Sequence, residues 1–318
     1  MNTFSPQQPV RREPPRRLDR AGRRRRARQR ILRSTAVLPS LLTIFNGLSG
    51  FACIHYATRR GLGAARPEDL QISAWMIFLA MIFDMLDGRV ARMTRKTSDF
   101  GAQLDSLSDV ISFGAAPAML MVQTVIMAMR GQIDRLDLLP DAMLLERVVW
   151  CIAGVYLACA ALRLARFNVE SVSDESAHMS FSGLPSPGAA AAVGSVVLLF
   201  VWLTQFDEGW RSSVWVLAAV CTILPVLTLA AGLLMVSRLR YSHVVNQYIR
   251  GRRPFGYIVK LVVVVLALLV EPMWTLAAVT VAYVLSGPVG WLWRARRGVP
   301  RPVEAAPVKA APKEQDYD

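Results

Sequence analysis

The fold is decided by the stretch Asp84-Met-Leu-Asp87-Gly88-Arg-Val-Ala91-Arg92, which is followed after eight residues by Gly101 and then by Asp105 and Asp109. The four aspartates lie at the ends of two long apolar segments, 72–92 and 101–129. On helices each pair shares one face, because the first two aspartates are spaced i,i+3 and the last two i,i+4. The basic and polar residues 92–98 predict a short turn at a membrane surface. Two helices joined by such a turn would bring both acidic pairs together.

A cluster of four aspartates predicts a metal site. Four like charges in a small volume are strongly unfavourable unless cations lie among them. Ligands that are all oxygen favour Mg²⁺ or Mn²⁺, which usually shares its coordination shell with a substrate phosphate. Two solvated helix ends that happen to carry acids are the less favoured alternative, because ionisable residues within apolar segments are usually functional. The small residues near the acids would let a bulky phosphate ligand approach the backbone; they are Gly88, Ala91 and Gly101.

The complete pattern, D-x2-D-G-x2-A-R-x8-G-x3-D-x3-D, resembles the signature of the CDP-alcohol phosphatidyltransferases. The chain matches this signature at every fixed position. The resemblance implies an enzyme embedded in a membrane, which transfers a phosphatidyl group from a CDP-lipid to an alcohol and releases CMP. No covalent intermediate is expected, because the fixed positions include no Ser, Cys or His.

The composition independently indicates a membrane protein. The chain has 318 residues, of which 53% are hydrophobic, and a net charge of +14. Several apolar segments approach twenty residues, the approximate length that spans a bilayer, and soluble proteins of this size do not normally contain them. We predict an all-α polytopic membrane protein with about eight transmembrane helices, at residues 36–57, 72–92, 101–129, 148–168, 184–205, 212–236, 255–270 and 272–293.

The basic residues are distributed as a membrane topology requires. With the N-terminus inside, the inside segments hold 30 of the 37 basic residues and the three polar outside loops hold seven. This asymmetry follows the positive-inside rule and predicts that the N- and C-termini are cytoplasmic. The acidic pairs would then lie at the cytoplasmic face of the cell membrane, where a CDP-lipid and a water-soluble acceptor can meet.

Three regions are expected along the chain. Residues 1–33 contain twelve arginines and several prolines, which predicts a disordered basic cytoplasmic arm lying on anionic lipid headgroups. Nucleic-acid binding is disfavoured, because no aromatic residues alternate with these arginines. Residues 34–298 would form the membrane-embedded domain, and residues 299–318 a disordered tail.

Cysteine labelling tests this topology. In a cysteine-free background, we expect cysteines at Thr97 and Val245 to react with a membrane-impermeant reagent from the cytoplasmic side. Cysteines at Ala64 and Leu138 should react from the opposite side. Labelling from the wrong side at any one of these positions would contradict the eight-helix arrangement.

Polar residues in the first and fourth apolar segments have two interpretations each. Thr43 and Asn46 lie on one helix face and either join helices or line the nucleotide pocket, as similar residues do in the resembling proteins. Arg163 and Arg166 are spaced i,i+3 and precede Asn168. They either extend to the interface, as arginines near helix ends often do, or bind a carboxylate or phosphate in a shared pocket.

The run Arg163-Leu-Ala-Arg166-Phe-Asn168 and the later Phe181-x-Gly183-Leu-Pro185-Ser-Pro187 resemble the phosphatidylserine synthases of this family. This resemblance implies CDP-diacylglycerol and L-serine as substrates and a homodimer in the bilayer. The expected roles are metal binding by Asp84, Asp87, Asp105 and Asp109; catalysis by Asp109 as general base with Asp105; CDP-lipid binding by Gly88, Ala91, Arg92, Gly101, Thr43 and Asn46; and serine binding by Arg163, Arg166 and Asn168.

Two alternatives remain open. The acceptor alcohol could instead be glycerol 3-phosphate, an inositol phosphate or choline. In a different class of protein, the acids could belong to the ion pathway of an ion-coupled membrane transporter. Transporters tend to place acids near the bilayer midplane, in broken or repeated helices, whereas these acids cluster at one interface.

Overall fold

A computed structural model of the chain describes residues 18–61, 65–94, 99–130, 142–173, 183–206, 214–239, 241 and 255–297. These residues form helices and no strands. In chain order the helices are α1 (Leu18–Thr58), α2 (Pro67–Thr94), α3 (Asp99–Asp109), η1 (Val110–Ala115), α4 (Ala116–Arg130), α5 (Ala142–Ser173), α6 (Ser186–Phe206), α8 (Val214–Val236), α10 (Phe255–Val270) and α11 (Pro272–Arg296).

The structure confirms the all-α polytopic class. Within the described residues, seven helical spans are long and apolar enough to cross a membrane. Large apolar side chains on their outer faces are exposed, as lipid-facing residues are; examples are Phe51, Trp215 and Val226. Of the eight predicted spans, 255–270 does not qualify. It forms α10, whose 16 residues extend about 24 Å, less than the roughly 30 Å of the hydrocarbon core.

The N-terminal region differs from the prediction. Residues 18–33, expected to be disordered, form the first part of α1, which continues without a break to Thr58. Arginine is a good helix former, so a stable helix over the apolar segment can propagate backwards through an arginine-rich sequence. The four positions chosen for labelling, 64, 97, 138 and 245, lie outside the described residues.

The centre of the bundle is the continuous rod α3–η1–α4. Nearly every residue of α4 is buried, including Leu120, Met121 and Val125. It contacts α1, α2, α5, α6 and α8, so its apolar surface is covered on several sides. The rod therefore gives the aspartates near its N-terminal end a rigid support.

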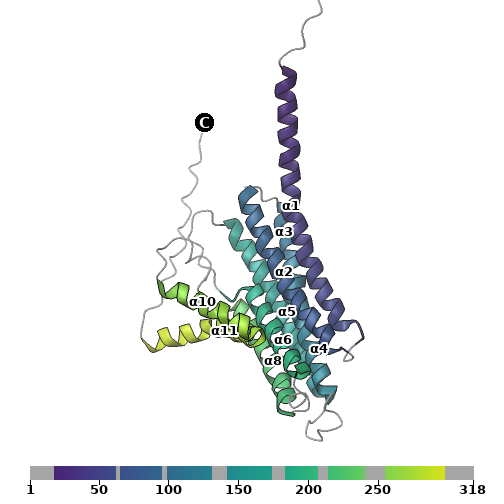
Figure 1. The fold of residues 1–318 in the computed structure, drawn as a ribbon, viewed down its shortest axis with the longest axis vertical. Coiled ribbons are helices and arrows are strands. Elements are labelled where there is room, and N and C mark those ends of the chain that lie inside the picture. The colour runs from purple at the N-terminus through teal and green to yellow at the C-terminus, as the bar shows by residue number, and fades with distance from the viewer. Residues whose placement is uncertain are drawn as a thin grey trace, which may run out of the picture.

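One end of the bundle collects the segments of interest. The chain runs down α1, up α2, down α3–α4, up α5, down α6 and up α8 (Figure 1). The last turns of α2, α5 and α8 and the first turns of α3 and α6 therefore lie at the same end, which we call the acidic end. At this end Gly183 adopts a left-handed conformation with φ of 94°, and a Cβ there would collide with the Met235 carbonyl oxygen.

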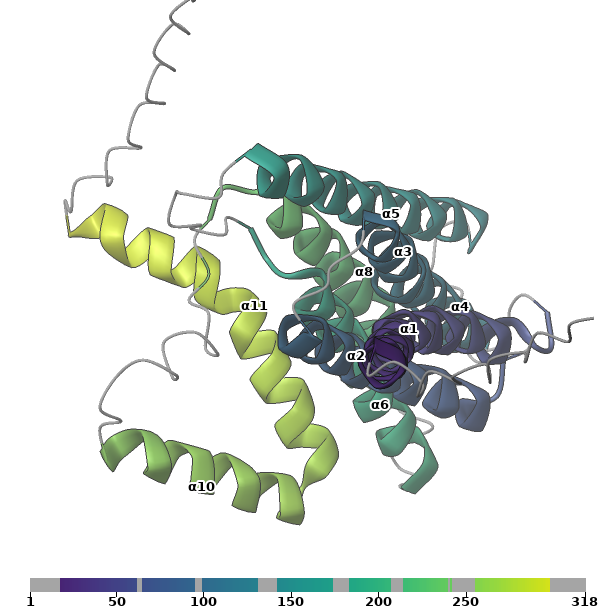
Figure 2. The ribbon, with the colours of Figure 1, turned by 90° about the horizontal axis from the view of Figure 1, so that it is seen from above.

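The last two helices lie across the bundle. Seen along the bundle axis, α1 is viewed end-on, whereas α10 and α11 are viewed from the side (Figure 2). Helix α11 packs on α6, and the hydroxyls of Ser195 and Thr280 are 2.6 Å apart at this contact. Predicted as the last transmembrane segment, 272–293 thus forms a helix of spanning length that crosses the others instead of running along them.

Candidate active site

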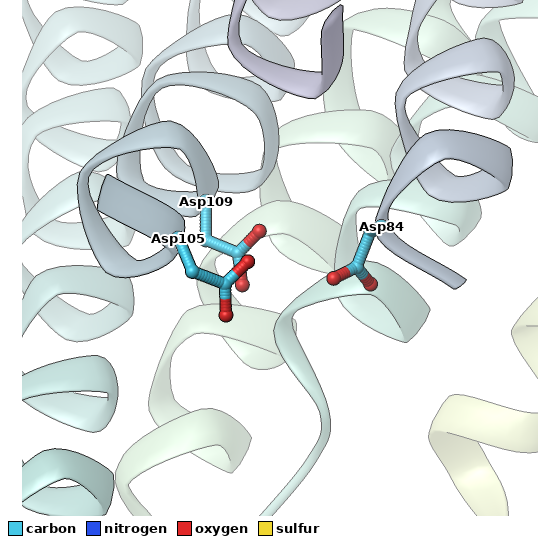
Figure 3. A group of neighbouring side chains, drawn as sticks. All are labelled: Asp84, Asp105 and Asp109. Atoms are coloured by element: carbon cyan, nitrogen blue, oxygen red, sulfur yellow. The ribbon is translucent and has the colours of Figure 1, made fainter. Parts of the chain in front are cut away.

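Three of the four predicted aspartates converge at the acidic end. Asp84 lies on α2, and Asp105 and Asp109 lie on α3. One oxygen from each carboxylate lies within 4.8 Å of the others. Figure 3 shows the carboxylates pointing from the two helices into the space between them. The sequence spacing therefore does produce one acidic site from two helices.

Asp87 takes part in the same acidic region through a different contact. It is buried, and its Oδ2 accepts a hydrogen bond of 3.0 Å from the Thr43 hydroxyl. Thr43 lies on α1, so this bond ties the first helix to the second at the level of the acids. Asp87 is outside the group of three whose oxygens converge within 4.8 Å.

Asn46 holds Asp109 in a similar way. Its Nδ2 donates a hydrogen bond of 2.9 Å to Asp109 Oδ1, and both side chains are buried. One residue of each predicted pair, Asp87 and Asp109, is thus held by a polar side chain of α1. Thr43 and Asn46 thus do join helices, and they do so by bonding the acids directly.

Close packing of α1 on the acidic rod makes these bonds possible. A Cβ on Gly50 would lie 2.6 Å from the Ser112 Cα, so only glycine permits this approach of the two backbones. The Ser112 hydroxyl then donates a hydrogen bond of 2.8 Å to the Asn46 carbonyl oxygen. The backbone that carries Asn46 is therefore fixed directly to the rod that carries Asp109.

The rod changes its helical form immediately after Asp109. Residues Val110–Ala115 form the π-helical turn η1. Such turns occur mostly as single turns inside α-helices and are frequent at functional sites. The buried Tyr156 hydroxyl on α5 donates a hydrogen bond of 3.0 Å to the Phe113 carbonyl oxygen in this turn. Helices α1 and α5 therefore hold the turn from separate positions.

The donor set fits a divalent cation. Asp105 Oδ1 and Asn46 Oδ1 are buried, and neither has a hydrogen-bond partner among the described residues. A buried acceptor without a partner costs about 1–3 kcal/mol, more when it is charged, and a bound cation removes that cost. Carboxylate and amide oxygens are the ligands that Mg²⁺ and Mn²⁺ prefer. The site can therefore hold a hard divalent ion.

Arg163 brings positive charge close to the acids. From α5, its Nη1 donates a hydrogen bond of 2.7 Å to the Ser186 hydroxyl at the start of α6. The guanidinium lies within electrostatic reach of Asp84 and Asp109. A half-buried arginine that faces a group of carboxylates is well placed to receive a substrate anion beside them.

The other two predicted acceptor residues are placed differently. Asn168 Nδ2 donates a hydrogen bond of 2.8 Å to the hydroxyl of Ser106, the neighbour of Asp105, so it joins α5 to α3 at the edge of the site. Arg166 lies on α5 one helical turn after Arg163, and its side chain is exposed. Arg163 is thus the more deeply placed of the two arginines.

The small residues of the motif lie on α2 and α3, the two helices that carry the acids. A Cβ on Gly88 would meet no atom within 4 Å, so space is open beside it. Ala91 and Gly101 are half-buried. The side chain of Arg92 lies outside the described residues.

Sequence reasoning missed several polar residues of the site. Ser106, Ser112 and Ser186 each bond a residue that was predicted, namely Asn168, Asn46 and Arg163. Their only signal in the sequence is proximity to the motif or to a helix start. Such serines are common in membrane helices, where they often bond their own backbone, so the pattern alone does not distinguish them.

Comparison with known proteins agrees with the geometry. The CDP-alcohol phosphatidyltransferase profile matches residues 36–226. A CDP-diacylglycerol–serine O-phosphatidyltransferase from Mycobacterium bovis is 33% identical over 186 residues, covering 57% of this chain and 55% of that protein. Proteins with the same name from Helicobacter pylori and Methanocaldococcus jannaschii are 29% identical over 261 residues and 35% identical over 172 residues.

These matches differ in extent. The Helicobacter alignment covers 81% of this chain and 92% of that protein, and the Methanocaldococcus alignment covers 54% and 64%. The chain thus spans about half the length of the mycobacterial relative that it matches. The matched profile nevertheless covers more than half of this chain and includes all four aspartates. The chain therefore belongs to the CDP-alcohol phosphatidyltransferase family.

Proposed function

We propose that the protein transfers the phosphatidyl group of CDP-diacylglycerol to L-serine, giving phosphatidylserine and CMP. The observation that carries this proposal is the convergence of Asp84, Asp105 and Asp109 beside the half-buried Arg163. The acids suit a cation-assisted phosphoryl transfer, and the arginine suits an acceptor that bears a carboxylate. The names of the relatives from three different organisms support the same substrate pair.

The metal site would use Mg²⁺ or Mn²⁺, held by Asp84, Asp87, Asp105 and Asp109. When bound, the ion supplies positive charge that stabilises the developing negative charge on the phosphoryl oxygens and on the departing CMP. Thr43 and Asn46 orient two of these carboxylates through the bonds at 3.0 and 2.9 Å. Orientation by neighbouring donors is the usual role of groups that surround metal ligands.

Asp109 would act as the general base. Its Oδ1 accepts a hydrogen bond from the Asn46 amide, so the other oxygen would accept the proton of the serine hydroxyl. As the proton moves to Asp109, the serine oxygen forms a bond to phosphorus and the bond between phosphorus and the CMP oxygen breaks. This direct attack requires no covalent enzyme intermediate, and Asp105 would assist at the same centre.

The CDP-lipid would lie along the small residues of the motif. The open space beside Gly88, together with Ala91 and Gly101, leaves room for the cytidine and the phosphates. Arg92 would pair with a phosphate. The site would lie at the cytoplasmic face of the cell membrane and belong to a homodimer. The basic arm, residues 1–33, would lie on anionic headgroups at the same face.

An assay that measures both products tests the reaction. We expect purified protein to release CMP from CDP-diacylglycerol with Mg²⁺ or Mn²⁺ only when L-serine is added, with phosphatidylserine formed in equal amount. The same assay should be run with glycerol 3-phosphate, an inositol phosphate and choline as acceptors. Faster CMP release with any of these would reassign the acceptor, and no release with any alcohol would overturn the proposal.

Arginine substitutions test the acceptor pocket. We expect Arg163→Ala to raise the serine KM about ten-fold or more, because a charge-assisted contact is worth about 1.5–3 kcal/mol and about 1.4 kcal/mol corresponds to a factor of ten. The KM for CDP-diacylglycerol should change little. Arg166→Ala, at a more exposed position, and Asn168→Ala complete the series. A rise confined to the KM for CDP-diacylglycerol, or no change in either KM, would contradict serine binding in this pocket.

A further inference from the structure

The π-helical turn η1 has a cause in the sequence. In a regular α-helix the Phe113 carbonyl oxygen would accept the N–H of residue 117, and residue 117 is proline. Proline has no N–H, and its ring clashes with the carbonyl four residues before it in a regular helix. The Ala116 N–H instead donates to the carbonyl oxygen of Ile111, which is the wider π-helical spacing. Pro117 therefore favours the turn.

Tyr156 of α5 supplies the hydrogen bond that Pro117 cannot. Its hydroxyl donates a hydrogen bond of 3.0 Å to the Phe113 carbonyl oxygen, and both residues are fully buried. Buried carbonyl groups need hydrogen-bond donors, because water cannot reach them. A donor from a neighbouring helix therefore stabilises the rod at the point where the proline interrupts its own hydrogen bonding.

Close packing fixes the position of this tyrosine. Helix α8 lies directly against it, since a Cβ on Gly232 would be 3.2 Å from the Tyr156 Cα and 3.4 Å from its Cδ2. Helix α5 also lies directly against the turn, since a Cβ on Gly114 would be 3.0 Å from the Leu157 Cδ1. The hydroxyl is therefore delivered to the turn from a place that leaves it little freedom to move.

The turn is the direct continuation of the helix that carries two of the converging aspartates. Asp109 is the last residue of α3, and Val110 is the first residue of η1. The direction of a side chain around a helix depends on how the helix winds, so a regular α-helix over the same residues would point Asp105 and Asp109 elsewhere relative to α4. Their convergence with Asp84, within 4.8 Å, thus depends on the turn.

We propose that Tyr156 is a positioning residue for the metal site. By holding the π-helical turn, it keeps Asp105 and Asp109 directed towards Asp84. It acts through the backbone of the rod, since its hydroxyl is directed to the Phe113 carbonyl oxygen. This inference rests on the proposed function, because the metal site is assigned there.

The test uses Tyr156→Phe, which removes only the hydroxyl. We expect the affinity of the purified protein for Mn²⁺, measured by electron paramagnetic resonance of the free ion without any substrate, to fall about 10- to 100-fold. Losses of this size are typical when a group that orients metal ligands is removed. The kcat for CMP release should fall by a similar factor, because Asp109 is displaced together with Asp105.

Ser73→Ala is the matched control. The buried Ser73 hydroxyl donates a hydrogen bond of 2.6 Å to the Cys53 carbonyl oxygen, so it also joins two helices through a backbone carbonyl. Ser73 lies in the first turns of α2, away from the acidic end. We expect this control to lower the melting temperature while leaving the Mn²⁺ affinity and kcat unchanged.

A second substitution separates positioning from stability. In the Tyr156→Phe protein, Pro117→Ala restores an N–H that the Phe113 carbonyl oxygen can accept once the rod winds as a regular α-helix. The melting temperature should therefore recover, while the Mn²⁺ affinity and kcat should fall by about ten-fold more, because the carboxylates are then misplaced. A residue needed only for stability would instead regain activity as stability returned.

The outcomes are distinct. The inference is overturned if Tyr156→Phe leaves the Mn²⁺ affinity unchanged, or if Ser73→Ala weakens Mn²⁺ binding as much as Tyr156→Phe does. Recovery of Mn²⁺ binding together with stability in the double variant would overturn it as well. Wild-type protein that binds Mn²⁺ but releases no CMP would overturn the proposed function alone, and the Mn²⁺ affinities of the variants would still decide the role of Tyr156.

Discussion

Replacing Asp84 by asparagine is expected to reduce serine-dependent CMP release by about 1,000-fold or more, equivalent to roughly 4 kcal/mol of transition-state stabilisation. Asp84 is the only member of the three converging carboxylates that α2 supplies. Asparagine keeps the shape of the side chain but removes the negative charge that would hold a cation. The measurement is kcat at saturating substrates over a range of Mn²⁺ concentrations.

The folded state should tolerate this substitution. Removing one of several neighbouring negative charges lowers their mutual repulsion, so the melting temperature of the metal-free protein should stay the same or rise. Asp69→Asn is the matched control, since Asp69 lies on the same helix but pairs with Arg60 at the opposite end of the bundle, at 3.0 Å. We expect this control to keep near wild-type turnover.

Two results would contradict the role of Asp84. One is a turnover by Asp84→Asn that is reduced by no more than about ten-fold from wild type, a much smaller loss than expected. The other is full activity of the wild-type protein in the presence of a strong chelator such as EDTA. The same reasoning extends to Asp105, whose buried Oδ1 has no hydrogen-bond partner within the described part of the chain.

Replacing Asp109 by asparagine should separate binding from chemistry. General base catalysis typically contributes 10²–10⁴-fold, so we expect kcat to fall by about that factor. Binding of CDP-diacylglycerol, measured directly with the purified protein, should persist, because Asp84 and Asp105 remain. Asp84→Asn, in contrast, should weaken binding as well as turnover, since the pyrophosphate would lose its cation.

Asn46→Ala is the companion variant for Asp109. It removes the donor at 2.9 Å without touching the carboxylate, so it should lower kcat less than Asp109→Asn does. Near wild-type turnover by Asp109→Asn would reassign the base to Asp105 or to water. Loss of CDP-diacylglycerol binding in Asp109→Asn would instead assign Asp109 to the metal site alone.

The bundle and the acidic motif were largely predictable from the sequence. Span lengths follow from bilayer thickness, so predicted segments such as 101–129 and 184–205 lie within a few residues of the helices found at 99–130 and 186–206. The i,i+3 and i,i+4 spacings predicted a shared helix face for each pair of aspartates, and three of the four do converge. Helical periodicity likewise placed Thr43 and Asn46 on one face, which does contact the acids.

The contacts made by distant segments were not predictable. Helix α11 packs on α6 only because it crosses the bundle, and no periodic pattern encodes a crossing direction. The helical form of residues 18–33 was missed because arginine-rich composition suggests disorder, although the apolar continuation stabilises a helix. Hydrogen bonds such as the one between Ser186 and Arg163 depend on these same packing directions.

The π-helical turn η1 has a consequence for how this sequence can vary. A regular α-helix advances about 100° per residue, and a π-helical turn accommodates one additional residue. The turn therefore sets the angular phase of Asp105 and Asp109 relative to the buried face of α4. Rewinding Val110–Ala115 as regular α-helix with its length unchanged would rotate both carboxylates by about 100° relative to α4, whereas deleting one residue as the turn rewinds would restore the present phase. The length and the helical form of this turn are thus constrained together.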